Sequence, residues 1–280
     1  MTRITEQPPQ YTHLENKSIE ELTRLINEED KIVPTAIEKA LPSVQKLIKA
    51  IVEKLKGEGR MFYVGAGSGG RLSVLDVIEL PTTFGIEEGR VNAVLAGGIE
   101  NLILALEDKE DDELEGWMAL QSKNISENDI VVGISASGTT PFVLATLKKC
   151  RENHIMTGCI VSNPSSPIAQ QADIPVEIIT GPEFITGSTR LKCGSAQKMV
   201  FDMISTVTMI QLGRVKDNKM VHVKLINKKI IDRAVHILME MGGLHDYDEA
   251  KTLLMDQGSV DRAIQHLHHS NKLTNGFTSL

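Results

Sequence analysis

The length, composition and charge of this chain limit what it can do. Its 280 residues are 41% hydrophobic and 24% charged, which suits a folded protein with a substantial core. The net charge of −7 argues against nonspecific binding to nucleic acid or to an anionic membrane. No stretch reaches the roughly 20 apolar residues that cross a bilayer, and the polar N-terminal sequence lacks the apolar core of a signal peptide. We therefore expect a cytoplasmic protein with neither a nucleic-acid nor a membrane partner.

The first part of the chain is predicted to be helical. Ser18 followed by Glu21 forms a capping box ahead of apolar residues at helical spacing. A second helix is expected to end at Gly57, with Pro42 as a candidate break. Residues 1–45 are accordingly interpreted as a helical arm.

Five apolar segments, separated by helical patterns, are predicted to be strands. They lie within MFYVGAGSGG, RVNAVLAGG, NDIVVGISASGTTP, IMTGCIVSNPSSPIAQQAD and IPVEIITGPE. Continuous apolar strands alternating with helices indicate a parallel sheet covered on both faces. We expect this α/β sandwich over residues 46–226. Short helices over residues 227–270 form a small appendage, and residues 271–280 are expected to be a flexible tail.

The cysteines and histidines suggest no disulfide and no metal site. Cys150, Cys159 and Cys193 form no C-x-x-C pair and are expected to be reduced structural thiols. The histidines of QHLHHS lack the H-E-x-x-H spacing of a zinc site. We therefore expect no bound metal.

The first strand runs into a glycine loop in which Gly65, Gly67 and Gly70 spell G-x-G-x-x-G. A dinucleotide site also needs an acidic residue at the end of the second strand, to bind the ribose. Here that strand ends in Ala96, Gly97 and Gly98 instead. The fingerprint is incomplete, so we expect no nicotinamide cofactor.

A second loop, GISASGTT at residues 133–140, has the composition of a phosphate site. It follows a strand and precedes a helix, so backbone N–H groups and the helix dipole favour an anion there. Its serine and threonine hydroxyls add further donors. Two such loops on one sheet can hold two parts of a phosphorylated sugar.

These loops resemble those of the sugar isomerase (SIS) domain, whose S-x-S-G-x-T motif reads here as Ser135 to Thr140. The segment GAGSGGRLSVLDVIELPTTFG is similar to one in N-acetylmuramic acid 6-phosphate etherases. The block GPEFITGSTRLKCGSAQK closely resembles the signature of that family. The glucokinase regulatory protein shares the signature, so the signature alone does not establish catalysis.

The resemblance implies an SIS-type three-layer sandwich with a parallel sheet, an N-terminal helical arm and a small C-terminal bundle resembling a ubiquitin-associated domain. It implies a homodimer with sites near the subunit interface and no cofactor. The implied reaction is that of a carbon–oxygen lyase. It cleaves the D-lactyl ether of N-acetylmuramic acid 6-phosphate to N-acetylglucosamine 6-phosphate and D-lactate during recycling of cell-wall amino sugars.

Such an ether lies β to the masked aldehyde of the sugar, so elimination needs a base at C2 and an acid at the leaving oxygen. Two carboxyls with separated pKa values can serve. The resemblance maps the family's catalytic glutamates onto Glu79 and Glu110. The apolar neighbours of Glu79 are expected to raise its pKa, which suits the acid. Without the resemblance, Glu110 would be assigned to the solvated face of an acidic run.

The residues expected to bind substrate are hydroxyl, glycine and basic residues of the matching motifs. Arginine suits bidentate recognition of a carboxylate, whereas Ser188 and Thr189 could instead cap the following helix. The full set is Ser68, Gly69, Arg71, Ser135, Ser137, Gly138, Thr140, Ser188, Thr189, Arg190 and Lys192.

Two other functions remain open at this point. A non-catalytic phosphosugar-binding regulator would bind ligand without turnover, and an aldose–ketose phosphate isomerase would release no lactate. The retained Glu79 and Glu110 count against the first, and the G-S-T-R-L-K block counts against the second.

Overall fold

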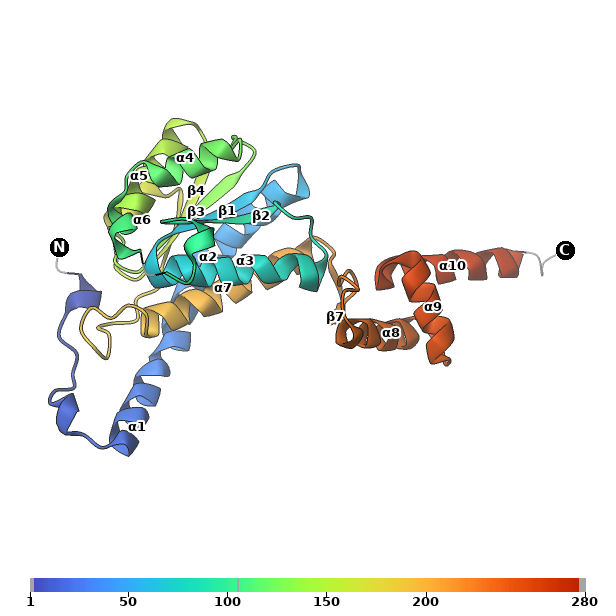
Figure 1. Cartoon of the computed structure of the whole chain (residues 1–280), viewed down its shortest axis with the longest axis horizontal. Coiled ribbons are helices and arrows are strands. Elements are labelled where there is room, and N and C mark those ends of the chain that lie inside the picture. Colours follow the sequence, from blue (N-terminus) through green and yellow to red (C-terminus); the bar gives the residue numbers. More distant parts are fainter. Residues whose placement is uncertain (1–2, 105, 277–280) are drawn as a thin grey trace. The chain divides into compact units, whose positions relative to one another are not determined.

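The computed structural model describes residues 3–104 and 106–276 (Figure 1). Its centre is a five-stranded parallel sheet with the strand order β2-β1-β3-β4-β5. The strands are β1 (Met61–Gly65), β2 (Val91–Leu95), β3 (Ile130–Ser135), β4 (Met156–Val161) and β5 (Ile174–Glu177). The expected parallel sheet is confirmed.

The strand order reverses beside β1, because β2 lies on one side of it and β3 on the other. In open α/β sheets a crevice forms at such a point, outside the carboxyl ends of the strands. The register pairs Gly65 with Ile134, so the glycine loop and the hydroxyl loop leave the sheet side by side. The topology thus brings together two motifs that lie about 70 residues apart in the chain.

Helices cover both faces of the sheet and give the expected three layers (Figure 1). Phe62 and Val64 of β1 pack into a core with Phe142 of α5. Tyr63, which points to the opposite face, packs its ring on Phe201 of α7 with 5.0 Å between centroids. One layer contains α4 (Glu115–Ser122), α5 (Pro141–Glu152) and α6 (Pro167–Gln171), and the other contains α2 (Ile32–Lys56), α3 (Gly67–Phe84) and α7 (Lys192–Gln211).

The N-terminal helices differ from the prediction at one proline. The Ser18 hydroxyl accepts a hydrogen bond from the Glu21 N–H at the start of α1 (Ile19–Asp30), so the predicted cap is confirmed. Pro42, however, does not break α2, which is continuous over 25 residues. The proline is exposed, and burial of the apolar stripe on the other side of α2 stabilises the helix despite the hydrogen bond lost at Pro42.

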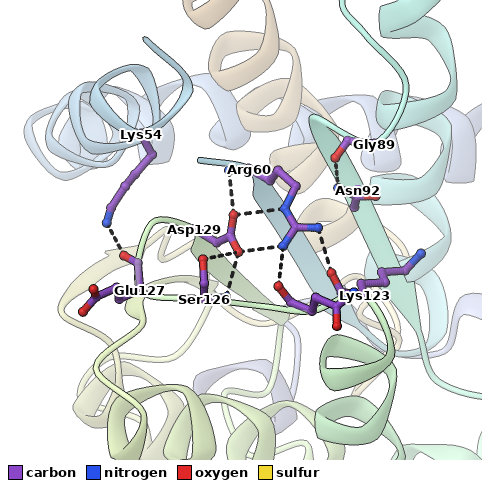
Figure 2. Close-up of polar contacts among 9 residues, drawn as sticks. Lys54, Arg60, Gly89, Asn92, Lys123, Ser126, Glu127 and Asp129 are labelled. Carbon is purple, nitrogen blue, oxygen red and sulfur yellow. Dashed lines mark hydrogen bonds and ion pairs between the residues drawn. The ribbon is translucent and has the colours of Figure 1, made fainter. Parts of the chain in front are cut away.

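An ion pair joins the amino ends of β1 and β3, at the edge of the sheet opposite the two loops (Figure 2). Asp129 is buried and accepts hydrogen bonds from the Arg60 guanidinium and from the Ser126 N–H. Burial alone would raise the pKa of Asp129, but these hydrogen bonds outweigh it and lower the pKa from its ordinary value of 3.8. The pair therefore connects the amino ends of these two strands.

The chain divides into two compact units, residues 1–77 with 89–208, and residues 78–88 with 209–280. The first contains both the sheet and the helices expected to form a separate arm. Within the described residues, no helix is both long and apolar enough to cross a membrane.

The second unit is a helical bundle with its own core. Val235, Leu238, Leu254, Val260 and Ile264 are buried together. Its elements are the short hairpin strands β6 (Val215–Lys216) and β7 (Lys219–Met220), and the helices α8 (Lys228–Gly242), α9 (Tyr247–Gln257) and α10 (Val260–Gly276). Part of the expected tail is therefore helical, and residues 277–280 lie outside the described residues.

Candidate functional site

A cavity of about 530 Å³ opens at the carboxyl ends of β1 and β3. It is lined by both predicted loops and by four further segments: the N-terminus, the acidic run, the loop before α7 and α7 itself. The lining residues that carry hydroxyl, carboxyl, amide or guanidinium groups are Arg3, Glu6, Ser68, Glu107, Glu110, Asp111, Ser135, Ser137, Thr139, Thr140, Thr189 and Gln197.

The glycine loop places the start of α3 against the sheet. A Cβ on Gly70 would lie 2.7 Å from the Gly65 carbonyl oxygen, so only glycine allows the helix to approach this closely. Ser68 and Gly69, in the first turn of α3, line the cavity. The first N–H groups of a helix have no partner within it, so this turn suits an anion.

The hydroxyl loop forms a connected network on the other side of the cavity. Ser135 Oγ lies 2.8 Å from Thr140 Oγ1 and 3.2 Å from Ser137 Oγ. The Gly138 N–H donates to Ser135 Oγ over 3.0 Å, so in this structure it serves the loop itself. Four hydroxyls, including that of Thr139, therefore lie on one wall of the cavity, where they can donate hydrogen bonds to an anion such as a phosphate.

One residue of the acidic run contacts the hydroxyl loop. Glu107, Glu110 and Asp111 all line the cavity, and of these three Glu110 is half-buried while the other two are exposed. Thr140 Oγ1 donates a hydrogen bond to Glu110 Oε1 over 2.7 Å. The short 3₁₀ helix Glu107–Asp111 thus brings one carboxylate into contact with the hydroxyl network.

Glu79 lies in α3, away from the first turn of that helix. It is exposed on α3 and is not among the residues that line the cavity. Of its expected apolar neighbours, Leu80 is buried but Ile78 is exposed. Successive residues of a helix point about 100° apart, so sequence neighbours do not enclose a side chain. Within a single chain Glu79 therefore lacks the apolar surroundings that were expected.

The remaining predicted binding residues have varied positions. Thr189 lines the cavity, and Arg71 borders it through an ion pair with Glu107 at 3.2 Å. Lys192 is buried in an ion pair with Glu29 and lines a second cavity. Ser188 and Arg190 line neither of these two cavities. An anion-binding role for these residues stays a prediction.

Neither Ser188 nor Thr189 caps α7. The cap is Glu183, whose two carboxylate oxygens accept hydrogen bonds of 2.9 Å from the N–H groups of Lys192 and Cys193. Glu183 is fully buried and belongs to the G-P-E-F segment, where the sequence shows a carboxylate but not its distance from the helix. These hydrogen bonds fix the loop before α7, which contains the cavity-lining residue Thr189.

The cysteines have no visible part in this site. All three are free and buried, and burial raises the pKa of both the Cys150 and the Cys193 thiol to about 12. Such thiols stay protonated near neutral pH. The prediction of structural thiols is confirmed.

Comparisons with known proteins agree with this geometry. Two family models match: the N-terminal SIS domain of glucokinase regulatory protein over residues 43–151, and the SIS domain over residues 115–207. The structure of a phosphoheptose isomerase from Francisella tularensis has the same fold. It superposes with a TM-score of 0.53 at 15% identity, covering 71% of this chain and 100% of that chain.

Curated relatives are much more similar in sequence. An N-acetylmuramic acid 6-phosphate etherase from Bacteroides fragilis is 50% identical, covering 94% of this chain and 93% of its own. One from Bacteroides thetaiotaomicron is 48% identical, covering 96% of this chain and 97% of its own. The chain therefore belongs to the N-acetylmuramic acid 6-phosphate etherase family of SIS-domain proteins.

Proposed function

We propose that this protein cleaves the D-lactyl ether of N-acetylmuramic acid 6-phosphate, releasing D-lactate and N-acetylglucosamine 6-phosphate. The names of the curated relatives support this activity. The observation that carries it in the structure is the hydrogen bond from Thr140 to Glu110, which places a carboxylate beside a cluster of hydroxyls. A phosphate held by those hydroxyls positions the sugar next to a group able to move protons.

The proposed chemistry is elimination followed by addition of water, which is the work of a carbon–oxygen lyase. Ring opening exposes the aldehyde and acidifies the C2 proton. A base removes that proton, the C3–oxygen bond breaks, and the lactate oxygen takes a proton from an acid. Water then adds its hydroxyl to C3 and returns a proton to C2, so the atoms balance. We assign the acid to Glu79 and the second acid–base role to Glu110.

The exposed position of Glu79 supports a homodimer in which it serves the partner subunit's cavity. The same helix, α3, exposes the apolar residues Leu75 and Ile78, and α7 exposes Val207 and Ile210. Exposed apolar side chains on neighbouring turns are typical of an interface between copies of a chain. In such a dimer Glu79 gains the apolar surroundings that a single chain does not provide.

The other expected substrate contacts belong to the same proposal. Ser68, Ser135, Ser137 and Thr140 bind the phosphate, and Arg71 is a candidate for the lactyl carboxylate. The buried free cysteines support a reducing, cytoplasmic setting.

The test is to measure release of D-lactate from N-acetylmuramic acid 6-phosphate, with D-lactate dehydrogenase as the coupled readout. Sustained release supports the etherase. Binding of N-acetylglucosamine 6-phosphate without any release would favour a regulatory protein, and conversion of a phosphosugar between aldose and ketose would favour an isomerase.

A further inference from the structure

The N-terminal residues are part of the cavity wall, although they lie about 130 positions before the hydroxyl loop. Arg3, which precedes the 3₁₀ turn Ile4–Glu6, and Glu6, the last residue of that turn, both line the cavity. Between them Thr5 has no accessible surface. The segment is therefore packed against the rest of the protein. Burial of the Thr5 hydroxyl and backbone costs free energy unless these groups form hydrogen bonds, so partners for them are expected.

Asn163 provides those partners. Its Oδ1 accepts hydrogen bonds from the Ile4 N–H at 2.6 Å and the Thr5 N–H at 3.3 Å, and its Nδ2 donates to Thr5 Oγ1 at 3.0 Å. The same Nδ2 donates to the carbonyl oxygens of Ala136 at 3.0 Å and Ser137 at 3.2 Å. Backbone N–H groups surround the Oδ1 atom and carbonyl oxygens surround the Nδ2 atom. Exchanging these two atoms would break the hydrogen bonds on both sides, so the amide has one orientation.

The segment also reaches the loop before α7. The Gly187 N–H donates to the Thr5 carbonyl at 3.2 Å, and a Cβ on Gly187 would lie 3.0 Å from a Glu6 carboxylate oxygen. Residues 3–6 therefore join the hydroxyl loop to the loop that carries Thr189. Both of these loops line the cavity.

The segment also contributes a positive charge to a cavity wall that is otherwise acidic. The cavity is lined by the carboxylates of Glu6, Glu107, Glu110 and Asp111, yet the proposed substrate carries a phosphate and a carboxylate. Among the described lining residues, Arg3 carries the one positive charge. Arg71, which borders the cavity, is already paired with Glu107.

We propose that residues 3–6 complete the substrate cavity, that Arg3 binds an anionic group of the substrate, and that Asn163 is a positioning residue that holds this segment against the hydroxyl loop. The inference rests on the proposed function for the identity of the substrate. It assigns to the N-terminus a part in substrate recognition, where the sequence indicated only a helical arm.

Arg3 is tested by binding measurements that need no turnover. In a Glu110→Gln background, calorimetry compares N-acetylmuramic acid 6-phosphate with N-acetylglucosamine 6-phosphate, with and without Arg3→Gln. We expect about tenfold weaker binding, the usual size for a lost charge-assisted contact. If only N-acetylmuramic acid 6-phosphate binds more weakly, Arg3 contacts the lactyl carboxylate. If both sugars bind more weakly, Arg3 contacts the phosphate.

Arg233→Gln is the matched control, because it removes an exposed arginine from α8 in the second unit. Unchanged binding of both sugars to the Arg3→Gln protein would overturn the assignment. Failure of the wild-type chain to release D-lactate would overturn the proposed function instead, so the two results are distinguishable.

Asn163 is tested by a double-mutant cycle with otherwise wild-type protein. We expect Asn163→Ala to raise KM about tenfold, and the further change Arg3→Gln to add little, because the first change already displaces Arg3. Fully additive effects, or an unchanged KM, would contradict a positioning role. If Asn163→Ala does not fold, Thr5→Val removes one hydrogen bond of the same link, and Thr5→Ser should restore the wild-type KM.

Discussion

Thr140 donates a hydrogen bond to Glu110 over 2.7 Å while its oxygen lies 2.8 Å from the Ser135 hydroxyl. A hydroxyl has one proton to donate, so Ser135 must donate to Thr140 in this arrangement. In the proposed reaction, the phosphate replaces Glu110 as acceptor of the Thr140 hydrogen bond, which leaves the Glu110 carboxylate free for proton transfer. Binding of the phosphate would therefore make the Glu110 carboxylate available as a proton acceptor.

Glu110→Gln should reduce D-lactate release by at least about 100-fold, the lower range for loss of an acid–base group. Binding of N-acetylglucosamine 6-phosphate should remain within a few-fold of wild type, because the hydroxyl loop is intact. Glu113→Gln is the matched control, since Glu113 is an exposed acid of the same run and does not line the cavity. Equal losses in both variants would argue against a specific role for Glu110.

Thr140→Val keeps the shape of the side chain and removes its hydroxyl. We expect kcat/KM to fall about tenfold or more, because the bound phosphate loses the hydrogen bond that Thr140 would donate to it. Thr140→Ser keeps the hydroxyl and should retain most of the activity. Steady-state kinetics of the two variants is the measurement, and similar losses would indicate a packing role rather than a hydroxyl role.

The shared site predicted for a homodimer can be tested by mixing inactive variants. Glu79→Gln and Glu110→Gln subunits, unfolded together and refolded, should regain about a quarter of wild-type activity. The reason is that half of the dimers are mixed and each mixed dimer has one intact site. Each variant refolded alone is the control. No recovery, in dimers shown by mass to be mixed, would place both glutamates in one subunit.

Asp129→Asn should lower the free energy of unfolding by about 2–3 kcal/mol near neutral pH, the size expected for charge-assisted hydrogen bonds to a buried carboxylate. The folded-state pKa of Asp129 is lowered, so its stabilisation is present above the ordinary value of 3.8 and is lost as pH falls through the folded value. The difference from wild type should therefore shrink below about pH 4.

Urea unfolding over a pH series measures this difference. Asp256→Asn, at an exposed position of α9, is the control. A stability difference that is independent of pH would mean that Asp129 acts through packing rather than through charge.

Much of the fold follows from local patterns in the sequence. The five apolar strands, the Ser18 cap and the glycine and hydroxyl loops are local features, and the structure has each of them. The behaviour of α2 at Pro42 could not be predicted in this way. It depends on which side of the helix is buried, and that is decided by packing against the sheet.

The parts of the site that the sequence did not predict arise from contacts between distant segments. Asn163 and Thr5 are 158 positions apart, and neither belongs to a pattern that indicates their contact. Glu183 is visible within a motif, but its role as a helix cap depends on the fold of the loop. The apolar residues next to Glu79 in the sequence predict apolar surroundings for its side chain. In a helix, however, successive side chains point in different directions, so sequence neighbours do not determine those surroundings.

Cleavage of the ether by elimination and addition is tested most directly by mass spectrometry of both products formed in heavy-oxygen water and in deuterated water. We expect unlabelled oxygen in D-lactate, one heavy oxygen at C3 of the amino sugar and one deuterium at C2. Heavy oxygen bonded to the lactyl carbon, or an amino sugar without deuterium at C2, would contradict it.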